Sequence, residues 1–416
     1  MAALSAPLSI YLHIPFCVHR CAYCDFNTYA GQEPLLPSYV NALTKEIHYV
    51  GQAAMTLSNP PPIGTIFFGG GTPSLLSPLQ LASVIKALRS TFDLAPHLEV
   101  TLEANPGSIS LEYLQRARAL GINRLSYGVQ SVHPRELRLL ERAHTFLDVI
   151  HAISWARQAG FDNLNLDLLY GLPEQTLTDW QTTLRRILDL NPEHLSLYAL
   201  TLEHGTPFGR WAARGLLPLP DPDLAADMYE WAGETLAANG YLQYEISNWA
   251  RINAEGDIQN TEWMCRHNLQ YWRALPYLGL GAGAHGYANG YRYSNVLRIK
   301  TYIERLASDA SRVTHGPFPF TPAVVNHHRQ TLQDEMSEFM LNGLRLTREG
   351  VAPTTFRARF GCNLQEAFGR EIEELVQLGL LEWAKMQTFG VSKTSDVLRL
   401  TVRGRLLGNQ VFLRFV

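Results

Sequence analysis

The 416-residue sequence contains few cysteines, no excess of positive charge and no long apolar segment. Its five cysteines do not suggest a disulfide framework, because a chain of this size can build its own core. The net charge of -3 provides no general attraction for nucleic acid. No uninterrupted apolar run of about 18 residues or more is present, so we expect no transmembrane helix. The N-terminal residues lack the pattern of a signal peptide. The length and the hydrophobic content of 46% suit a globular protein of two or perhaps three domains. Free thiols predict a reducing, cytoplasmic setting.

Three of the five cysteines lie close together in the stretch YLHIPFCVHRCAYCDF at residues 11–26. Three residues separate Cys17 from Cys21, and two separate Cys21 from Cys24. A structural zinc site usually needs a fourth ligand at matching spacing, which neither the nearby histidine nor the two remaining cysteines provides. Three thiolates can hold a [4Fe–4S] cluster with one iron open to another ligand. The spacing therefore favours an iron–sulfur cluster, with zinc or reactive thiols as the alternatives.

Six segments of strand-like composition recur along the N-terminal two-thirds of the sequence, and helical patterns separate them. The predicted strands are 9–14, 65–68, 97–102, 124–129, 164–169 and 194–200. This alternation predicts an α/β fold with a parallel sheet and right-handed crossovers. Eight such units would close a TIM barrel, whereas six predict an open, partial barrel. Residues 205–223 read as a long loop, either a lid over the barrel mouth or a plain connection.

Polar or glycine residues stand at or near the ends of several predicted strands. Three glycines and Thr72 follow the second strand, where they either form a tight turn or let backbone N–H groups approach a ligand. Glu103 follows the third strand, Gln130 follows the fourth, and Asp167 lies within the fifth. Because sites in such barrels form at the C-terminal ends of the strands, we expect these residues to share one site.

The composition changes after a Pro-containing linker, which indicates a separate C-terminal domain. We predict a barrel with an extension over 1–306, the linker over 307–322 and a C-terminal domain over 323–416. That domain is expected to contain three helices, two short strands and a last helix, over 333–342, 351–359, 364–378, 380–384, 397–400 and 401–415. This order resembles a winged-helix module. Its third helix is rich in glutamate, which disfavours phosphate binding, so no nucleic-acid partner is expected.

The cysteine stretch resembles the radical S-adenosylmethionine (SAM) superfamily. FFGGGTPS, EANP, SYGVQS, ERAH and NLDLLYGLP resemble its oxygen-independent coproporphyrinogen III oxidase group. The resemblance implies that Cys17, Cys21 and Cys24 bind a [4Fe–4S] cluster whose open iron binds SAM, and that an electron donor reduces the cluster. The residues that it implies as SAM contacts are Tyr11, Gly70, Gly71, Thr72, Glu103, Gln130, Arg142 and Asp167.

Two departures separate the sequence from the oxidase. The oxidase has a further cysteine two residues after the third cluster ligand, where this sequence has Phe26, and it has a longer segment before the motif. Both departures resemble the HemW branch of heme chaperones, and HNLQYW at 267–272 fits the HNxxYW signature of that branch. The resemblance implies a role in porphyrin metabolism in which heme is bound and transferred to an acceptor protein, without oxidation of a porphyrinogen.

The heme ligand is left open among His267, Cys265 and His285, because imidazole and thiolate both bind heme iron. Tyr271 and Trp272 are candidates to pack on the macrocycle. Alternatively, HNxxYW only supports the edge of the barrel. Whether the protein is an enzyme is also left open. The alternative functions are a coproporphyrinogen III dehydrogenase, another radical SAM enzyme and a DNA-binding regulator.

Overall fold

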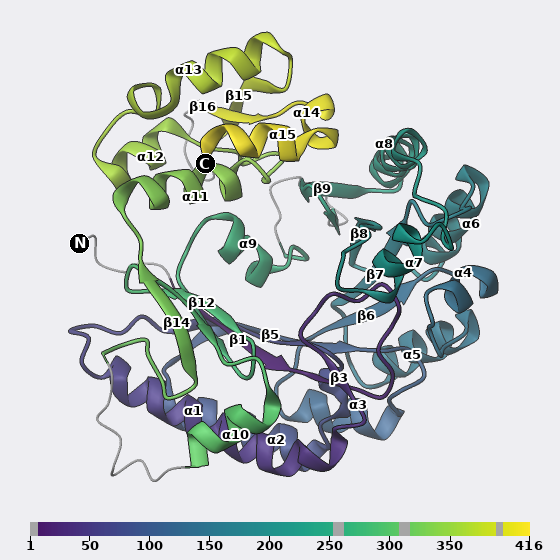
Figure 1. Ribbon diagram of the computed structural model, residues 1–416, viewed down its shortest axis with the longest axis vertical. Helices are drawn as coiled ribbons and strands as arrows, with labels where there is room; N and C mark the ends of the chain where they lie inside the picture. The colour runs from purple at the N-terminus through teal and green to yellow at the C-terminus, as the bar shows by residue number, and fades with distance from the viewer. Residues whose placement is uncertain (1–6, 253–261, 308–316, 388–393) are drawn as a thin grey trace. The chain divides into compact units, whose positions relative to one another are not determined.

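The computed structural model describes residues 7–252, 262–307, 317–387 and 394–416 (Figure 1). The chain forms two compact units. The barrel unit contains Leu4–Ala232 and Pro276–His328, and the C-terminal unit contains Gly233–Leu275 and Arg329–Val416. This grouping differs from the division made on sequence, because 233–275 join the C-terminal residues. The boundaries 1–306, 307–322 and 323–416 stay a prediction. None of the helices described is long and apolar enough to cross a membrane.

A parallel sheet forms the centre of the barrel unit, and all six predicted strands are confirmed. They are adjacent in the order β1 (Leu8–Ile14), β4 (Ile63–Gly70), β5 (Leu94–Ala104), β6 (Arg124–Gln130), β7 (Leu164–Tyr170) and β8 (His194–Ala199). Most side chains on these strands are buried, as expected for a parallel sheet. The C-terminal ends of the six strands therefore meet along one edge, as predicted.

Helices connect the strands and cover the sheet. They are α1 (Leu36–Ala54), α2 (Pro78–Thr91), α3 (Leu111–Ala119), α4 (Pro134–Leu139), α5 (Phe146–Gln158) and α6 (Leu177–Leu188), with 3-10 turns at Glu33–Leu35 and Pro73–Leu75. Several of these helices begin at a capping residue that can be recognised in the sequence. Ser77, Thr145 and Thr176 each form a capping box with the residue three positions later, which pairs two backbone N–H groups at the helix start.

The segment after β8 corrects one prediction, because it is not a continuous loop. It contains α7 (Pro207–Ala213), and α8 (Pro222–Ala238) begins within it. The side chain of Thr206 accepts a hydrogen bond from Gly209 N at 3.0 Å, and Pro207 occupies the first helical position. Both are known start signals for a helix. The prediction of a loop over 205–223 was therefore wrong for these residues.

Four further strands, which the sequence did not predict, extend the sheet on the other side of β1. β11 (Tyr277–Leu280) pairs parallel with β1, and β12 (His285–Ala288), β13 (Tyr291–Asn295) and β14 (Val324–Arg329) follow in order. The helix α10 (Ile299–Ala307) lies with α1 and α2 along one face (Figure 1). Because β11 pairs with it, β1 lies inside the sheet and not at its edge.

A buried carboxylate on α1 joins this returning segment to the rest of the barrel unit. Glu46 accepts hydrogen bonds from Gly281 N (2.7 Å), Asn295 Nδ2 (2.8 Å), Thr321 Oγ1 (2.9 Å) and Tyr302 OH (2.6 Å). Four donors satisfy the oxygens of a group that would be costly to bury alone. We interpret Glu46 as a structural residue.

The C-terminal unit has its own apolar core, which includes Phe356, Phe368, Leu400 and Val411. Its elements are β9 (Tyr241–Glu245), β10 (Asn248–Arg251), α9 (Arg266–Trp272), α11 (Leu332–Gly343), α12 (Pro353–Phe360), α13 (Leu364–Gln377), β15 (Leu381–Gln387), β16 (Thr394–Leu400), α14 (Val402–Leu406), α15 (Gly408–Phe412) and a 3-10 turn at Leu413–Phe415. The predicted three helices followed by an antiparallel strand pair are confirmed.

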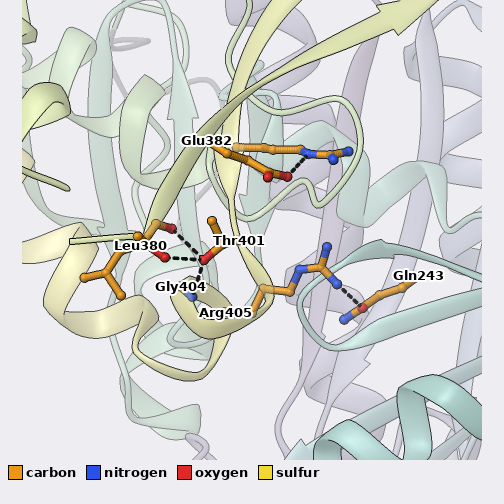
Figure 2. Close-up of polar contacts among 8 residues, drawn as sticks. Gln243, Leu380, Glu382, Thr401, Gly404 and Arg405 are labelled. Atoms are coloured by element: carbon orange, nitrogen blue, oxygen red, sulfur yellow. Dashed lines mark hydrogen bonds and ion pairs between the residues drawn. The ribbon is translucent and has the colours of Figure 1, made fainter. Parts of the chain in front are cut away.

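The single helix predicted over 401–415 is wrong, because the backbone of Leu407 leaves the helical region and separates α14 from α15. The start of α14 is fixed by Thr401 (Figure 2). Its hydroxyl accepts from Gly404 N at 2.9 Å and donates to Gly379 O at 2.8 Å. Arg405 Nη1 then donates to Gln243 Oε1 at 2.8 Å, which connects α14 with β9.

Candidate cluster and SAM site

The three clustered cysteines lie on a loop that leaves the C-terminal end of β1. Two short strands, β2 (Phe16–Cys17) and β3 (Tyr29–Ala30), pair in parallel and close this loop. Within it, Cys24 N donates to Cys21 O at 3.1 Å and forms a turn. The guanidinium of Arg20 donates to the carbonyls of Cys24 (3.2 Å) and Phe26 (3.3 Å). We call residues 17–28 the cysteine loop.

Asn27 anchors the cysteine loop to the returning segment of the barrel unit. Its Nδ2 donates to the carbonyls of Ala282 and Leu297, both at 3.1 Å. Its own carbonyl lies 2.9 Å from His13 Nε2, and because a carbonyl can only accept, Nε2 carries the proton. His13 Nδ1 is then the acceptor for the hydroxyl of Tyr11 at 3.0 Å. Tyr11, a predicted SAM contact, thus donates to a residue that supports the loop.

A cavity of about 140 Å³ lies between the cysteine loop and the ends of β4 to β7. Apart from Tyr11, all of the residues predicted to bind the cluster or SAM line it: Cys17, Cys21, Cys24, Gly70, Gly71, Thr72, Glu103, Gln130, Arg142 and Asp167. The structure also places Asn105, Ser126 and Gly128 on its wall, which sequence reasoning missed. The signal for Asn105 was its position in EANP, directly after the third strand.

The glycines after β4 form a turn and also line this cavity. Gly71 N donates to Ile14 O at 2.9 Å, and Thr72 N donates to Phe16 O at 2.8 Å. Gly70 has a φ of 116°, which other residues rarely adopt. A Cβ atom on Gly71 would stand 2.5 Å from Phe16 O and 2.9 Å from Cys17 Sγ. Only glycine at this position allows the turn to approach the cysteine so closely.

Arg142 carries positive charge to the cavity wall. Its Nη2 donates to Asn105 Oδ1 and Gly128 O, both at 2.6 Å, and its Nη1 donates to Cys21 Sγ at 3.5 Å. The Nε of Arg142 is buried and has no hydrogen-bond partner in the structure. The hydroxyl of Thr72 accepts from Asn105 Nδ2 at 3.0 Å and donates to Cys17 Sγ at 3.7 Å. The thiols of Cys21 and Cys17 therefore each receive a hydrogen bond, and Cys24 Sγ shares one of 3.9 Å with Thr28 Oγ1.

Two carboxyl groups face the other side of the cavity. Glu103 Oε2 accepts from Gly70 N at 3.1 Å. Burial, and then the nearby charge of Asp167, raises the pKa of Glu103 to about 8. Burial also raises the pKa of Asp167, although Asn165 and Ser126 donate hydrogen bonds to it at 2.8 and 3.1 Å. The pair can offer both an acidic proton and acceptor oxygens to hydroxyl or ammonium groups of a ligand.

The donor set of the cavity fits an iron–sulfur cluster. Three thiols, of Cys17, Cys21 and Cys24, line one cavity, and burial raises the pKa of the Cys17 and Cys24 thiols. Hydrogen bonds from Arg142 and Thr72 would help to stabilise thiolates after metal binding. Over the described ranges, no group of three His, Cys, Asp or Glu side chains is arranged to hold a single metal ion.

The residues of the HNxxYW stretch lie on and beside α9 in the C-terminal unit. Cys265 is buried and precedes the helix. His267 is also buried, and its Nε2 shares a hydrogen bond of 2.8 Å with the hydroxyl of Tyr271. The guanidinium of Arg345 lies 4.3 Å from the ring centre of Trp272, whose Nε1 is buried without a hydrogen-bond partner in the structure. His285 belongs to the barrel unit, where its side chain is exposed on β12.

Comparisons with known proteins identify the family. The model of the radical SAM superfamily matches residues 11–187, and that of the HemN C-terminal domain matches residues 330–386. Heme chaperone HemW of Bacillus subtilis is 37% identical over 412 residues, which cover 98% of this chain and 99% of the relative. The chain belongs to the HemW family. HemW of Haemophilus influenzae is 38% identical over 417 residues, which cover 99% of this chain and 98% of the relative.

A solved structure supports the fold of this HemW-family chain. Coproporphyrinogen III oxidase (HemN) of Escherichia coli, a radical SAM enzyme, matches with a TM-score of 0.77 and 25% identity. The match covers 98% of this chain and 90% of the oxidase. The predicted partial TIM-like barrel with a C-terminal module is therefore confirmed. Membership of the radical SAM superfamily implies a [4Fe–4S] cluster and SAM as cofactors.

Proposed function

We propose that this protein is a heme chaperone that binds heme, transfers it to an acceptor protein, and carries a [4Fe–4S] cluster with an exchangeable SAM. The observation that carries the proposal is the similarity to heme chaperones over nearly the whole chain. Phe26 supports it, because this side chain lines the cavity where the oxidase group has a cysteine, and it cannot supply a thiolate. We also propose that the protein works in the cytoplasm, where thiols stay reduced.

In this proposal Cys17, Cys21 and Cys24 hold the cluster. Thr72 and Arg142 donate hydrogen bonds to two of these sulfur atoms and thereby help to orient and stabilise the thiolates. A bound cluster would have to be reduced by an electron from outside the protein, so an external electron donor is a proposed partner.

The remaining cavity residues are proposed to bind SAM. Arg142 is suited to a carboxylate through its positive charge, and its Nε is a donor without a hydrogen-bond partner in the structure. Glu103 and Asp167 are suited to hydroxyl or ammonium groups. Gly70, Gly71 and Thr72 expose backbone at the cavity wall, and Gln130 lines it with a φ of 68°. Tyr11 is proposed to act indirectly, through its hydrogen bond to His13.

For heme, the proposed iron ligand is one of His267, Cys265 and His285, with Tyr271 and Trp272 packing on the macrocycle. Ligation through His267 Nε2 would require its hydrogen bond to Tyr271 to break. Cys265 would have to become exposed, whereas His285 is already exposed. These differences make single alanine variants at the three positions informative.

The proposed function is tested by an anaerobic heme titration of the cluster-reconstituted protein, followed by absorbance. We expect saturable binding of about one heme per chain, because one axial ligand holds one heme iron. An alanine variant of the true ligand shifts or weakens the heme absorbance and leaves iron and sulfide content unchanged. His151→Ala, at an exposed position on α5, serves as a control. Absence of specific heme binding would contradict the proposal.

A coproporphyrinogen III dehydrogenase is the second candidate, because the oxidase of this type shares the fold over 98% of the chain. Anaerobic turnover of coproporphyrinogen III with proportional consumption of SAM would favour it over the chaperone. Cleavage of SAM that depends on another substrate would instead indicate a different radical SAM enzyme.

A further inference from the structure

The two residues between Cys21 and Cys24 are held by α7, the helix in the segment that was predicted to be a loop. Phe208 N donates a hydrogen bond to Ala22 O at 3.0 Å. The N–H groups in the first turn of a helix have no partner within the helix. Here one of them pairs with a carbonyl of the cysteine loop, so the backbone of α7 is joined directly to the stretch that carries two of the three cysteines.

Side chains reinforce this backbone contact. Phe208 and Ala22 are fully buried, and the ring of Tyr23 lies 6.5 Å from the ring of Phe208. The centres of the Phe208 and Trp211 rings are 5.7 Å apart. The apolar core around them is completed by Leu140, Leu169, Leu172, Leu200 and Leu217. Ala22 and Tyr23 are thus packed between α7 and residues at the ends of β7 and β8.

The position of α7 is itself closely constrained. The Thr206 hydroxyl accepts from Gly209 N and also donates to Glu203 O at 2.7 Å. A Cβ atom on Gly209 would stand only 2.1 Å from Glu203 O, so the helix packs against the chain that precedes it. This packing fixes the start of α7 against the residues that precede it.

We propose that the side chain of Phe208 is a positioning residue for the iron–sulfur cluster: through its packing in one apolar core with Ala22 and the Tyr23 ring, it sets where Cys21 and Cys24 present their sulfur atoms. The inference rests on the proposed function, because it requires that these cysteines hold a cluster. In this inference the segment 205–223 supports the cysteine loop and is not a lid over the barrel mouth, because α7 packs directly on that loop. Phe208 does not line the cavity, and it acts only through its neighbours.

The test compares the wild type with Phe208→Ala, Phe208→Leu and Phe161→Ala after anaerobic reconstitution. Phe161 is the matched control, because it is 2% exposed in the barrel unit and packs under Arg118, outside the core around α7. The measurements are the rate of iron loss to a chelator, the midpoint potential, and the EPR spectrum of the reduced cluster with and without SAM. Circular dichroism reports whether each apo variant is folded.

We expect Phe208→Ala to lose iron about tenfold faster than the wild type, in line with the effect of other residues that orient metal ligands. Its EPR spectrum and midpoint potential should shift, and Phe208→Leu should restore most of both. Phe161→Ala should lose thermal stability but keep the wild-type spectrum and iron-loss rate. A Phe208→Ala protein that matches the wild type or Phe161→Ala in every cluster measurement would overturn the inference.

Two further outcomes are distinguishable. If Phe208→Ala does not fold, Trp211→Ala decides the question, because it removes the half-buried ring packed on Phe208 and should raise the iron-loss rate by a smaller factor. An unchanged rate in that variant would overturn the inference. A wild-type protein that holds no cluster would refute the proposed function, and this inference with it. A stable wild-type cluster with unaffected variants refutes the inference alone.

Discussion

Replacement of Gly71 by alanine tests the assignment of Cys17 as a cluster ligand, because the added methyl group would clash with this cysteine and with the residue before it. Its Cβ would stand 2.5 Å from Phe16 O and 2.9 Å from Cys17 Sγ. Favourable contacts between carbon atoms begin at about 3.5 Å, and sulfur is larger than carbon, so the overlap is about 1 Å. Phe16 O also accepts a hydrogen bond from Thr72 N at 2.8 Å, which restrains its withdrawal. Because the shorter of the two contacts is with a backbone oxygen, the turn or the Phe16–Cys17 backbone must shift, and the Cys17 sulfur is displaced as well.

We expect Gly71→Ala to cost about 1–3 kcal/mol of stability, the usual range for an inserted methyl group in a packed site. The φ of Gly71 is not in the left-handed region, so the effect is steric and not conformational. Displacement of one ligand should lower the iron and sulfide bound after reconstitution and weaken SAM binding about tenfold or more. The assays are denaturant unfolding of the apo protein, iron and sulfide analysis, and SAM titration.

Gly233→Ala is the matched control for this prediction. Gly233 lies within α8, and a Cβ atom there would meet nothing within 4 Å. Alanine at this position should stabilise the helix by up to about 1 kcal/mol and leave the cluster unchanged. If Gly71→Ala retained wild-type stability, iron content and SAM affinity, the close approach of Gly71 to Cys17 would be wrong.

Three other predictions address the carboxyl pair, the thiols and the C-terminal unit. The pKa of Glu103 is raised from 4.5 to about 8, so its contribution to stability is present at low pH and is lost as the pH rises towards 8. The full shift corresponds to roughly 5 kcal/mol. Because Glu103 is only half-buried and borders the cavity, we expect about 1–2 kcal/mol. Glu103→Gln should therefore flatten the dependence of the unfolding free energy on pH between about 4.5 and 8; an unchanged curve would show that this carboxyl is not perturbed. Cys21→Ser should abolish cluster binding in iron and sulfide analysis, whereas Cys362→Ser should keep a full cluster. Thr401→Ala removes the cap of α14 and should cost about 1 kcal/mol in thermal denaturation, with Thr401→Ser close to the wild type.

The six parallel strands were predictable because each is a short apolar run with its own boundaries. The returning strands were not, since β11 and β12 have only four residues each and contain glycine. A Cβ atom on Gly279 would stand 1.8 Å from His285 O, so that glycine is required by a neighbouring strand. No local periodicity signals such a requirement.

In the candidate site, too, the features with a local sequence signal were predictable and those that depend on distant contacts were not. Glu103 and Asp167 could be assigned to one site because parallel strands end along one edge of a sheet. The supports of the cysteine loop could not, because Asn27 and Phe208 act through contacts with residues far away in sequence. The helix α7 was predictable in part. Thr206 and Pro207 are a helix start signal in the sequence, but the length of the segment over 205–223 suggested a loop.

The position of β1 between β4 and β11 has a consequence for the order of events on the ribosome. A nascent chain that has just completed β8 still lacks β11, so it presents β1 as an edge strand. It also lacks the carbonyls of Ala282 and Leu297 that hold Asn27. At roughly 5–20 residues per second, translation needs about 5–20 seconds more to reach Leu297. During this interval the three cysteines are present on an incompletely supported loop, and we therefore expect stable cofactor insertion to follow translation of the returning strands.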